Sequence, residues 1–394
     1  MQKKVLVTGI GGVGGYAGHL LARVPGIEII LADVRGNYAQ QKANNIHIDN
    51  YFQMNSVKYP KISGIKFDMF DIPDMAKALK EIQPDVILNL ASLQSWWVVH
   101  HIPADIRIRI SDGYPVGTGL RPWAPNHMVF LYNLMVAIIE AGIKTHLVNG
   151  AGCDYCHEAL DKIGLAPTVG IGDFAFNEVM IKRVVAAKLG IPASNVDVMM
   201  VGHHVMCIPI TERGDVQGIP NWVRISVHGK DITSQFDIEK DIWAQIPKTV
   251  APPEPLHGTN QEYVASSAVK NVLAILFDTG EVVHAPGPCG LPGGYPTRLS
   301  ASGAEVVVPE GLTMDEMIDM MKAANRCEGI ETVTDDGALV ATEHTIKIVE
   351  EVFEIDWEYK AMRPQDAIKA SEEIRSAYRK LTEKYKDYEA TLAE

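Results

Sequence analysis

The chain has 394 residues, of which 47% are hydrophobic and 22% charged, an ordinary composition for a globular protein. Its net charge of -13 argues against nucleic acid or an anionic membrane as a partner, because both require basic patches. Every apolar run falls short of the roughly 18 residues that span a membrane. Five cysteines, an odd number, favour a reducing cytosol over a disulfide framework. The opening residues MQKKVLV enter a strand at once, so we expect a cytoplasmic protein without a signal peptide.

The first element is an apolar strand at 5–8 that runs into a glycine-dense turn, and a helical pattern follows at 16–24. Three glycines fit the spacing G-x-G-x-x-G: Gly9, Gly11 and Gly14. In a strand–turn–helix unit the first allows the tight turn, the second lets the backbone approach a pyrophosphate, and the third lets helix and strand pack closely. The free N–H groups of the helix N-terminus favour phosphate binding. This unit therefore predicts a dinucleotide site.

A second apolar strand at 27–32 ends at Asp33, about 20 residues past the glycines, where an acidic residue binds the adenosine ribose in such units. Asp33 would repel a 2′-phosphate, which favours NAD over NADP, and nearby Arg35 weakens that preference. The predicted cofactor-binding residues are Gly9, Gly11, Gly12, Val13, Gly14, Asp33, Val34, Ala91, Ser92 and Asn149.

Strands and helices then alternate to about residue 150, as in a parallel sheet with crossover helices. The predicted elements are strands at 65–68, 85–91 and 145–149 and helices at 73–82 and 127–141. Between them, residues 93–125 are irregular and include Trp96, Trp97, His100 and His101. A loop of that length inside a compact domain is usually functional. The two tryptophans could either form an aromatic surface that contacts a substrate or pack against the protein and fix the loop.

The second half changes character. It predicts helices at 177–189, 266–277 and 313–326, strands at 196–201, 223–227, 297–299 and 305–308, and a helical end. The predicted fold class is α/β: a doubly wound parallel Rossmann sheet followed by an α+β substrate and oligomerisation domain. We place the NAD-binding domain at 1–150, the catalytic and substrate domain at 151–330, and a helical extension at 331–394.

These blocks together resemble the lactate/malate dehydrogenase superfamily in order and spacing. Beyond the glycine turn, the similar segments are Gly119-Leu120-Arg121, the strand ending at Asn149 followed by Asp154, Gly170-Ile171-Gly172, Gly202-His203-His204 and Gly294-Tyr295-Pro296. The resemblance implies an NAD-dependent oxidoreductase that acts on a secondary alcohol or a 2-hydroxy or 2-oxo acid. We expect a homodimer or homotetramer and a small-molecule substrate.

The resemblance also implies the catalytic residues. His204 falls on the family's catalytic histidine, whose pKa suits proton exchange with a hydroxyl group. We interpret the neighbouring His203 as a structural or supporting group, with the alternative that the two histidines exchange roles and His203 is catalytic. Arg121 would polarise the substrate oxygen. Asn149 would bind the nicotinamide ribose or the substrate oxygen.

The sequence departs from the family where the hydroxy-acid enzymes carry an Asp and an Arg after Gly-x-Gly. Asp173 or Glu178 is the candidate for orienting the histidine, and Met180 stands where the carboxylate-binding Arg is expected. This puts a simple lactate-like substrate in doubt.

Two alternatives remain open. Asp173 with His203 and His204 could hold a divalent ion, as in the superfamily's NAD- and metal-dependent glycosidases, although we assign no metal. The chain could also be a non-catalytic NAD sensor.

The segment Cys153-x-x-Cys156-His157 could bind zinc or exchange thiols, but we favour a structural helical turn because one pair does not complete a zinc site.

Overall fold

The computed structural model describes residues 2–53, 59–95, 98–99, 102–249 and 261–386. The predicted roles of Trp96, Trp97, His100 and His101 lie outside these residues, as does the side chain of Asp173. None of the helices in the described ranges combines the length and apolar character that crossing a bilayer requires.

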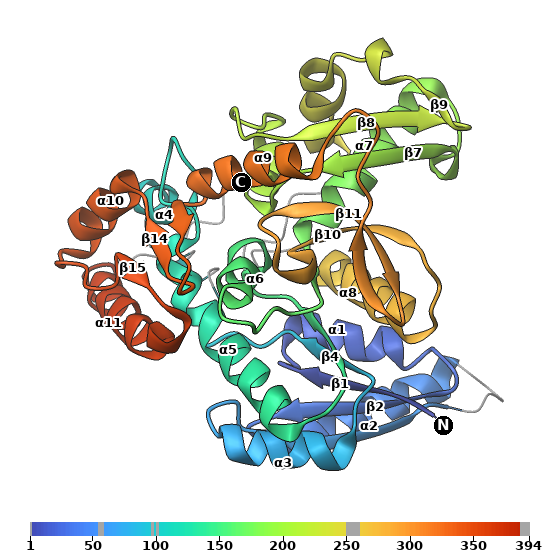
Figure 1. The fold of residues 1–394 in the computed structure, drawn as a ribbon, viewed down its shortest axis with the longest axis vertical. Helices are drawn as coiled ribbons and strands as arrows, with labels where there is room; N and C mark the ends of the chain where they lie inside the picture. Colours follow the sequence, from blue (N-terminus) through green and yellow to red (C-terminus); the bar gives the residue numbers. More distant parts are fainter. Residues whose placement is uncertain (1, 54–58, 96–97, 100–101, 250–260, 387–394) are drawn as a thin grey trace.

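A six-stranded parallel sheet in the order β3-β2-β1-β4-β5-β6 forms the base of the molecule in Figure 1. This confirms the predicted doubly wound fold class. Its strands are β1 (Lys3–Thr8), β2 (Ile27–Asp33), β3 (Lys61–Lys66), β4 (Val86–Asn89), β5 (His146–Asn149) and β6 (Val169–Gly170). The third strand therefore begins and ends earlier than the predicted 65–68.

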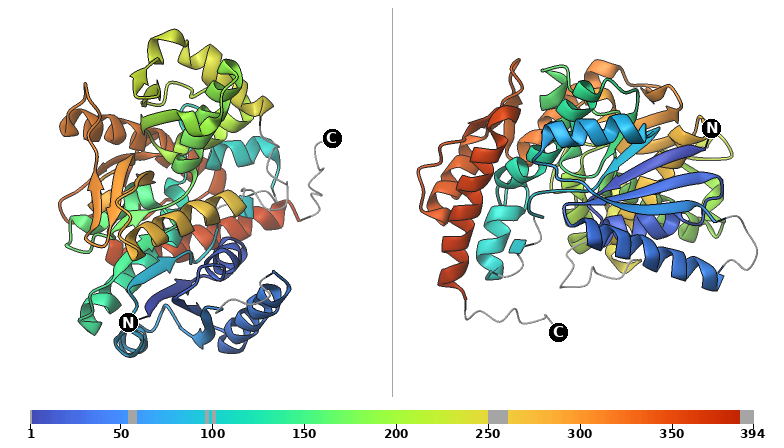
Figure 2. Two further views of the ribbon diagram at one scale, coloured as in Figure 1. Left: turned by 90° about the vertical axis from the view of Figure 1, so that its right-hand side faces the viewer. Right: turned by 90° about the horizontal axis from the view of Figure 1, so that it is seen from below.

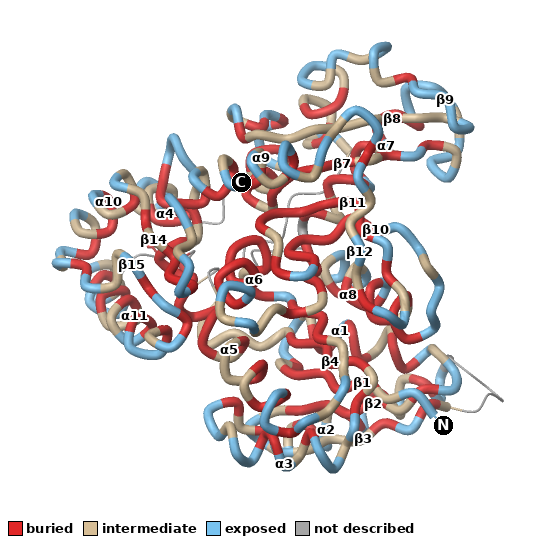
Figure 3. The backbone as a smooth tube through the Cα atoms, in the orientation of Figure 1, coloured by how far each residue is buried: buried red, intermediate tan, exposed pale blue. Residues whose placement is uncertain are grey.

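Helices cover both faces of this sheet because each central strand buries alternate side chains on opposite sides. The helices of the chain's first half are α1 (Gly12–Leu21), α2 (Gly36–Gln53), α3 (Ile72–Ile82), α4 (Ala104–Ser111), α5 (Ala124–Ala141) and α6 (Cys153–Asp161). Val5 and Val7 pack toward α1 and α2, whereas Leu6 packs toward α3, α5 and α6. The buried layers appear as the red inner stretches of Figure 3.

The second half adds two smaller antiparallel sheets above the parallel one. Their strands are β7 (Val196–Val201), β8 (Trp222–Val227), β9 (Lys230–Asp231), β10 (Val282–Pro286), β11 (Gly294–Ser300) and β12 (Gly303–Val306). The helices are α7 (Asp173–Leu189), α8 (Gln261–Leu276) and α9 (Met314–Cys327). A bridge between Gly202 and Gly294 joins the end of β7 to β11. That bridge holds the segment after β7 over the centre of the molecule.

The chain after 330 was predicted to be helical and is partly a sheet. It contains β13 (Ile330–Val333), β14 (Leu339–Ala341), α10 (Glu343–Phe353), β15 (Ala361–Met362) and α11 (Ala367–Lys384). This segment packs side chains such as Val349 and Ile374 against Val99, Ile110 and Trp123. Residues 93–125, predicted to be irregular, therefore contain helical structure: α4 and a short 3-10 helix at Arg121–Trp123. Figure 2 shows α10 and α11 standing beside α4, away from the parallel sheet.

The three predicted domains stay a prediction. The sixth strand of the parallel sheet lies at 169–170, and α8 packs on the same face of that sheet as α1. Residues beyond 150 thus complete the nucleotide half, which the boundary at 150 does not anticipate.

Candidate functional site

One cavity of about 590 Å³ joins the glycine turn after β1 to the segment after β7. Gly9, Gly11 and Asp33 line one end of it, and Asp154 and His204 line the other. It lies where the carboxyl ends of β1, β4 and β5 meet, which is where ligands bind in open α/β sheets. Except for Asn149, the residues predicted for a cofactor therefore share one space with the predicted catalytic histidine.

The glycine turn has the geometry that its spacing predicts. Gly9 has a φ of +75°, and a Cβ there would lie 2.3 Å from the backbone nitrogen of Ala91. A Cβ on Gly14 would lie 2.2 Å from the carbonyl oxygen of Gly9. A Cβ on Gly11 would meet nothing within 4 Å, so this backbone borders open space. The turn leaves room for a ligand at Gly11 and at no other of the three motif positions.

The start of α1 suits an anionic group. No side chain caps its N-terminus, and its first turn carries no acidic residue. Its first N–H groups thus keep their capacity to donate to a phosphate. The other predicted cofactor residues that line the cavity are Gly12, Val13, Val34, Ala91 and Ser92.

Asp33 ends β2 at the rim of the cavity, and Arg35 pairs with it. Oδ1 of Asp33 accepts hydrogen bonds from the backbone nitrogen of Arg35 at 2.9 Å and from its Nε at 3.0 Å. The Arg35 guanidinium also stacks on the ring of Tyr38, 4.2 Å from its centroid. The carboxylate is therefore fixed at the position where a ribose is expected, with a cation beside it.

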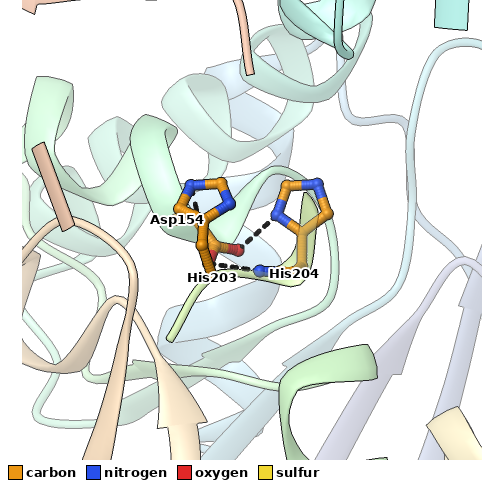
Figure 4. A group of neighbouring side chains, drawn as sticks. All are labelled: Asp154, His203 and His204. Carbon is orange, nitrogen blue, oxygen red and sulfur yellow. Dashed lines mark hydrogen bonds and ion pairs between the residues drawn. The ribbon is translucent and has the colours of Figure 1, made fainter. Parts of the chain in front are cut away.

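The opposite end of the cavity holds a histidine–aspartate pair (Figure 4). Asp154 lies in the first turn of α6, and His204 follows β7. Nδ1 of His204 donates to Oδ2 of Asp154 at 2.8 Å, and the backbone nitrogen of His204 donates to Oδ1 at 3.2 Å. Two bonds from one carboxylate fix both the position and the ring orientation of His204.

A second carboxylate lies on the other side of the imidazole. Oε1 of Glu328, at the end of α9, is 3.5 Å from Nε2 of His204 and accepts from the backbone nitrogen of Leu120 at 2.6 Å. Burial alone would lower the pKa of His204, but Glu328 and Asp154 together raise it well above its usual value. Burial would raise the pKa of Asp154, but the charge of His204 and its two hydrogen bonds hold that pKa below its usual range instead. The geometry favours a protonated His204 between two carboxylates.

His203 does not line the cavity. It is fully buried, its Nδ1 accepts from the backbone nitrogen of Val205 at 3.2 Å, and its Nε2 donates to Oδ1 of Asn325 at 2.9 Å. Burial lowers its pKa. The prediction that His203 could serve as a catalytic residue is therefore corrected: its ring is a neutral support behind Asp154.

Asn149 is also fully buried, and its amide is used within the protein. Its Nδ2 donates to the carbonyl of Ala151 at 2.8 Å and to Nε2 of His157 at 3.0 Å, and its Oδ1 accepts from Asn89 at 2.8 Å. These bonds hold the chain that runs from β5 into α6. The geometry does not support the predicted contact of Asn149 with a nicotinamide ribose or a substrate, and we assign it the role of positioning this turn.

Arg121 points away from the cavity, contrary to its predicted role. Its side chain is fully buried, and Nη2 donates to the carbonyls of Leu339 at 2.7 Å and Tyr359 at 3.0 Å. The guanidinium also lies 5.0 Å from the ring of Trp357. Burial lowers its pKa to about 10, so it keeps its charge at neutral pH. Arg121 ties the irregular segment to the C-terminal part of the chain and does not polarise a substrate oxygen there.

The orienting acid also differs from the prediction. Glu178 forms an ion pair with Lys182 and lies 4.0 Å from His284, on a different cavity. Met180 is buried in the core of the second half. Asp154 takes the orienting role, from α6 instead of from the helix after Gly-x-Gly.

The segment Cys153-x-x-Cys156-His157 forms the start of α6 and is buried. The thiol of Cys153 donates to the carbonyl of Asn149 at 3.0 Å, and Nδ1 of His157 donates to the carbonyl of Gly287 at 2.8 Å. The favoured structural interpretation agrees with these bonds.

In the part of the chain that the structure describes, one group of side chains has a spacing that could hold a metal ion. Asp154, His203 and His204 each offer an atom within 4.8 Å of the others. His203 is a poor ligand, because Nδ1 accepts a backbone hydrogen bond and Nε2 therefore carries the proton that a metal would have to displace.

Sequence reasoning missed Asp154 as the orienting acid and missed Glu328 altogether. A signal for Asp154 existed, because it lies five residues after a central strand and within a segment that resembles the family's. Glu328 gave no signal, because its approach to His204 depends on how α9 packs.

Comparisons with known proteins support the fold. No family model matches the chain. Malate dehydrogenase of Halobacterium salinarum is 30% identical over 154 residues, which cover 37% of this chain and 47% of that protein. The chain thus spans about half the length of the curated relative that it matches.

Solved structures of low sequence identity share the fold. Lactate dehydrogenase from Cryptosporidium parvum, complexed with lactic acid and nicotinamide adenine dinucleotide, is 20% identical with a TM-score of 0.56, over 83% of this chain and 96% of that one. Malate dehydrogenase from Plasmodium falciparum is 15% identical with a TM-score of 0.55, over 82% and 95%. Lactate dehydrogenase from Eimeria maxima with NADH and oxamate is 15% identical with a TM-score of 0.57, over 83% and 92%.

Proposed function

We propose that this chain, a divergent protein of the lactate/malate dehydrogenase type, is an NAD-dependent oxidoreductase of a secondary alcohol or a 2-hydroxy or 2-oxo acid. The single observation that carries the proposal is the cavity that joins the glycine turn to His204 and Asp154. One end has the features of a dinucleotide site, and the other holds a proton-exchanging pair.

The residues at the first end fit NAD. Gly11 borders open space at the uncapped start of α1, where a pyrophosphate would be held. The carboxylate of Asp33 would accept hydrogen bonds from the adenosine ribose. When bound, NAD supplies the acceptor for a hydride. Asp33 favours NAD over NADP, and Arg35 beside it makes this preference a modest one.

His204 and Asp154 perform the proton transfer. In alcohol oxidation, neutral His204 accepts the hydroxyl proton at Nε2 while Asp154 holds the proton on Nδ1. In carbonyl reduction the protonated ring donates the same proton. Because two carboxylates favour the protonated ring, reduction is the better supported direction at neutral pH.

The test is a search for hydride transfer with the purified full-length chain. We expect NADH to bind, and we expect NAD to be reduced by at least one compound from a panel of hydroxy acids, secondary alcohols and polyols. A protein that binds NADH but turns over no compound, with or without His204→Gln, would be a sensor. Activity that is lost on chelation would favour the metal-dependent hydrolase.

A further inference from the structure

Glu328 lies beside His204, at the reacting end of the cavity, although it does not itself line the cavity. It is almost completely buried, with 1% of its surface exposed. Its Oε1 is held by the backbone nitrogen of Leu120 at 2.6 Å and lies 3.5 Å from Nε2 of His204. Nε2 is the atom that must exchange a proton with a substrate if the proposed function holds. The carboxylate therefore stands next to the place where the reacting oxygen would lie.

The groups around that place are negative on balance. Asp154 and Glu328 flank His204, and both are buried. Burial lowers the pKa of His203, and it lowers that of His127 to about 4, so both rings are neutral at pH 7. Two carboxylates then face one imidazolium or, when His204 is neutral, no positive charge. Buried charges are weakly screened, so a further negative charge here is strongly disfavoured.

The described residues at this end supply no cation other than a protonated His204. Among the described residues that line the cavity, the one arginine or lysine is Arg35, and it pairs with Asp33 at the opposite end. Arg121 is turned toward the carbonyls of the C-terminal part, and the buried Met180 belongs to a separate core. A substrate carboxylate would therefore lie near two buried acids, with no arginine or lysine among the described residues at this end to pair with it.

We propose that Glu328 makes this site selective for an uncharged secondary alcohol or polyol, or the corresponding ketone, over a hydroxy or oxo acid. This inference rests on the proposed function. In oxidation the substrate carbon gives a hydride to NAD, its hydroxyl proton passes to Nε2 of His204, and the C–O bond becomes a carbonyl. An uncharged hydroxyl group adds no charge near Glu328 and Asp154, whereas a carboxylate places a further negative charge beside them.

The test compares acids with their amides, which differ by a charge at nearly constant shape. Lactate and lactamide differ by one charge, and malate and malamide by two. Their binding to the NADH-saturated full-length protein is measured by ligand-observed NMR, and their turnover is followed in separate samples that contain NAD. Glu328→Gln keeps an oxygen for the Leu120 N–H and removes the charge. Glu331→Gln, at an exposed carboxylate nearby that pairs with Arg326, is the matched control.

We expect the wild-type protein and Glu331→Gln to prefer the amides at least tenfold. Glu328→Gln should lose most of that preference, and the acid limb of its pH profile should move to lower pH. Tighter binding of an acid than of its amide overturns the proposal, as does equal or undetectable binding of both. If Glu328→Gln does not fold, the wild-type preference decides alone. If the protein does not bind NADH, or transfers hydride with none of the compounds, the proposed function is overturned instead. In that case the ratio of amide binding to acid binding, measured without cofactor, still tests the charge selectivity.

Discussion

The two ends of the cavity are built in opposite ways. The end at Gly9, Gly11 and Asp33 comes from one stretch of about 30 residues, and local backbone geometry determines it. The end at His204 comes from three distant segments, which also supply Asp154 and Glu328. The first end can be read from spacing, whereas the second exists only once the tertiary structure has formed.

The largest effect is expected at the His204 end of the cavity, which is built from distant segments. Replacing His204 by Gln removes the proton-exchanging group, so turnover should fall by about 10²–10⁴-fold. The affinity for NADH should not change, because the glycine turn is distant. Steady-state kinetics and NADH fluorescence titration measure the two quantities. His19→Gln is the control, since His19 bonds to Asp49 outside the cavity. A loss of NADH affinity with unchanged turnover would contradict the division of roles.

Asp154→Asn should weaken the same end in a pH-dependent way. The folded state raises the pKa of His204, so this contribution to stability is complete below about pH 6.5 and is lost as the pH rises through the folded-state pKa. The pKa of Asp154 is depressed, so its contribution is present above about pH 4 and is lost on acidification.

The substitution should therefore lower the free energy of unfolding by about 1.5–3 kcal/mol between pH 4 and 6.5, and by less in alkali. Urea unfolding at several pH values measures this difference. An equal loss of stability at pH 5 and pH 9 would show that the ion pair does not form.

Arg121→Met tests the correction made to the predicted catalytic arginine. Removing the guanidinium leaves buried carbonyls of Leu339 and Tyr359 without a donor, which should lower the free energy of unfolding by about 1–3 kcal/mol. Turnover per folded molecule should remain as in the wild-type protein. A selective loss of turnover without a loss of stability would restore the catalytic role that the family resemblance implies.

Paired glycine substitutions test the end of the cavity at Gly9, Gly11 and Asp33. The smallest effect on stability is expected here, for Gly11→Ala. Gly9→Ala places a Cβ against Ala91 at a positive φ and should lower the free energy of unfolding by about 1–3 kcal/mol. Gly11→Ala meets no protein atom, so stability should be unchanged. Its methyl group borders the space for a pyrophosphate, so NADH should bind about tenfold more weakly, which is 1.4 kcal/mol. Equal effects of the two substitutions on both quantities would contradict the assigned geometry.

The same contrast explains what the sequence could predict of the fold. The ends of helices that a glycine closes were placed well, as α5 before Gly142 and α7 before Gly190 show, although both helices begin earlier than predicted. Helix α2 was missed because Ile46 is the one large apolar side chain on its buried face, beside Ala39, Ala43 and Asn50. The sheet β13-β14-β15 was missed because its strands are only two to four residues long.

Prediction of the site followed the same limits. His204 lines the cavity as expected, because it closely follows a strand in a segment that resembles a known pattern. Its catalytic role stays a prediction. Arg121 was placed in the site by a similar local pattern, but its contacts are with residues more than 200 positions away, which no local pattern reports. The orienting acid moved from α7 to α6 for the same reason. The homodimer or homotetramer and the cytoplasmic location stay predictions.

A crystal structure of the full-length chain with NADH tests the division of the cavity most directly. We expect the adenosine ribose at Asp33, the pyrophosphate at Gly11, and the nicotinamide ring beside His204, leaving space for a substrate carbon and oxygen about 3–3.5 Å from their reacting partners. A nicotinamide ring bound away from His204 and Asp154 would contradict the proposed function, even if the adenosine half is bound as expected.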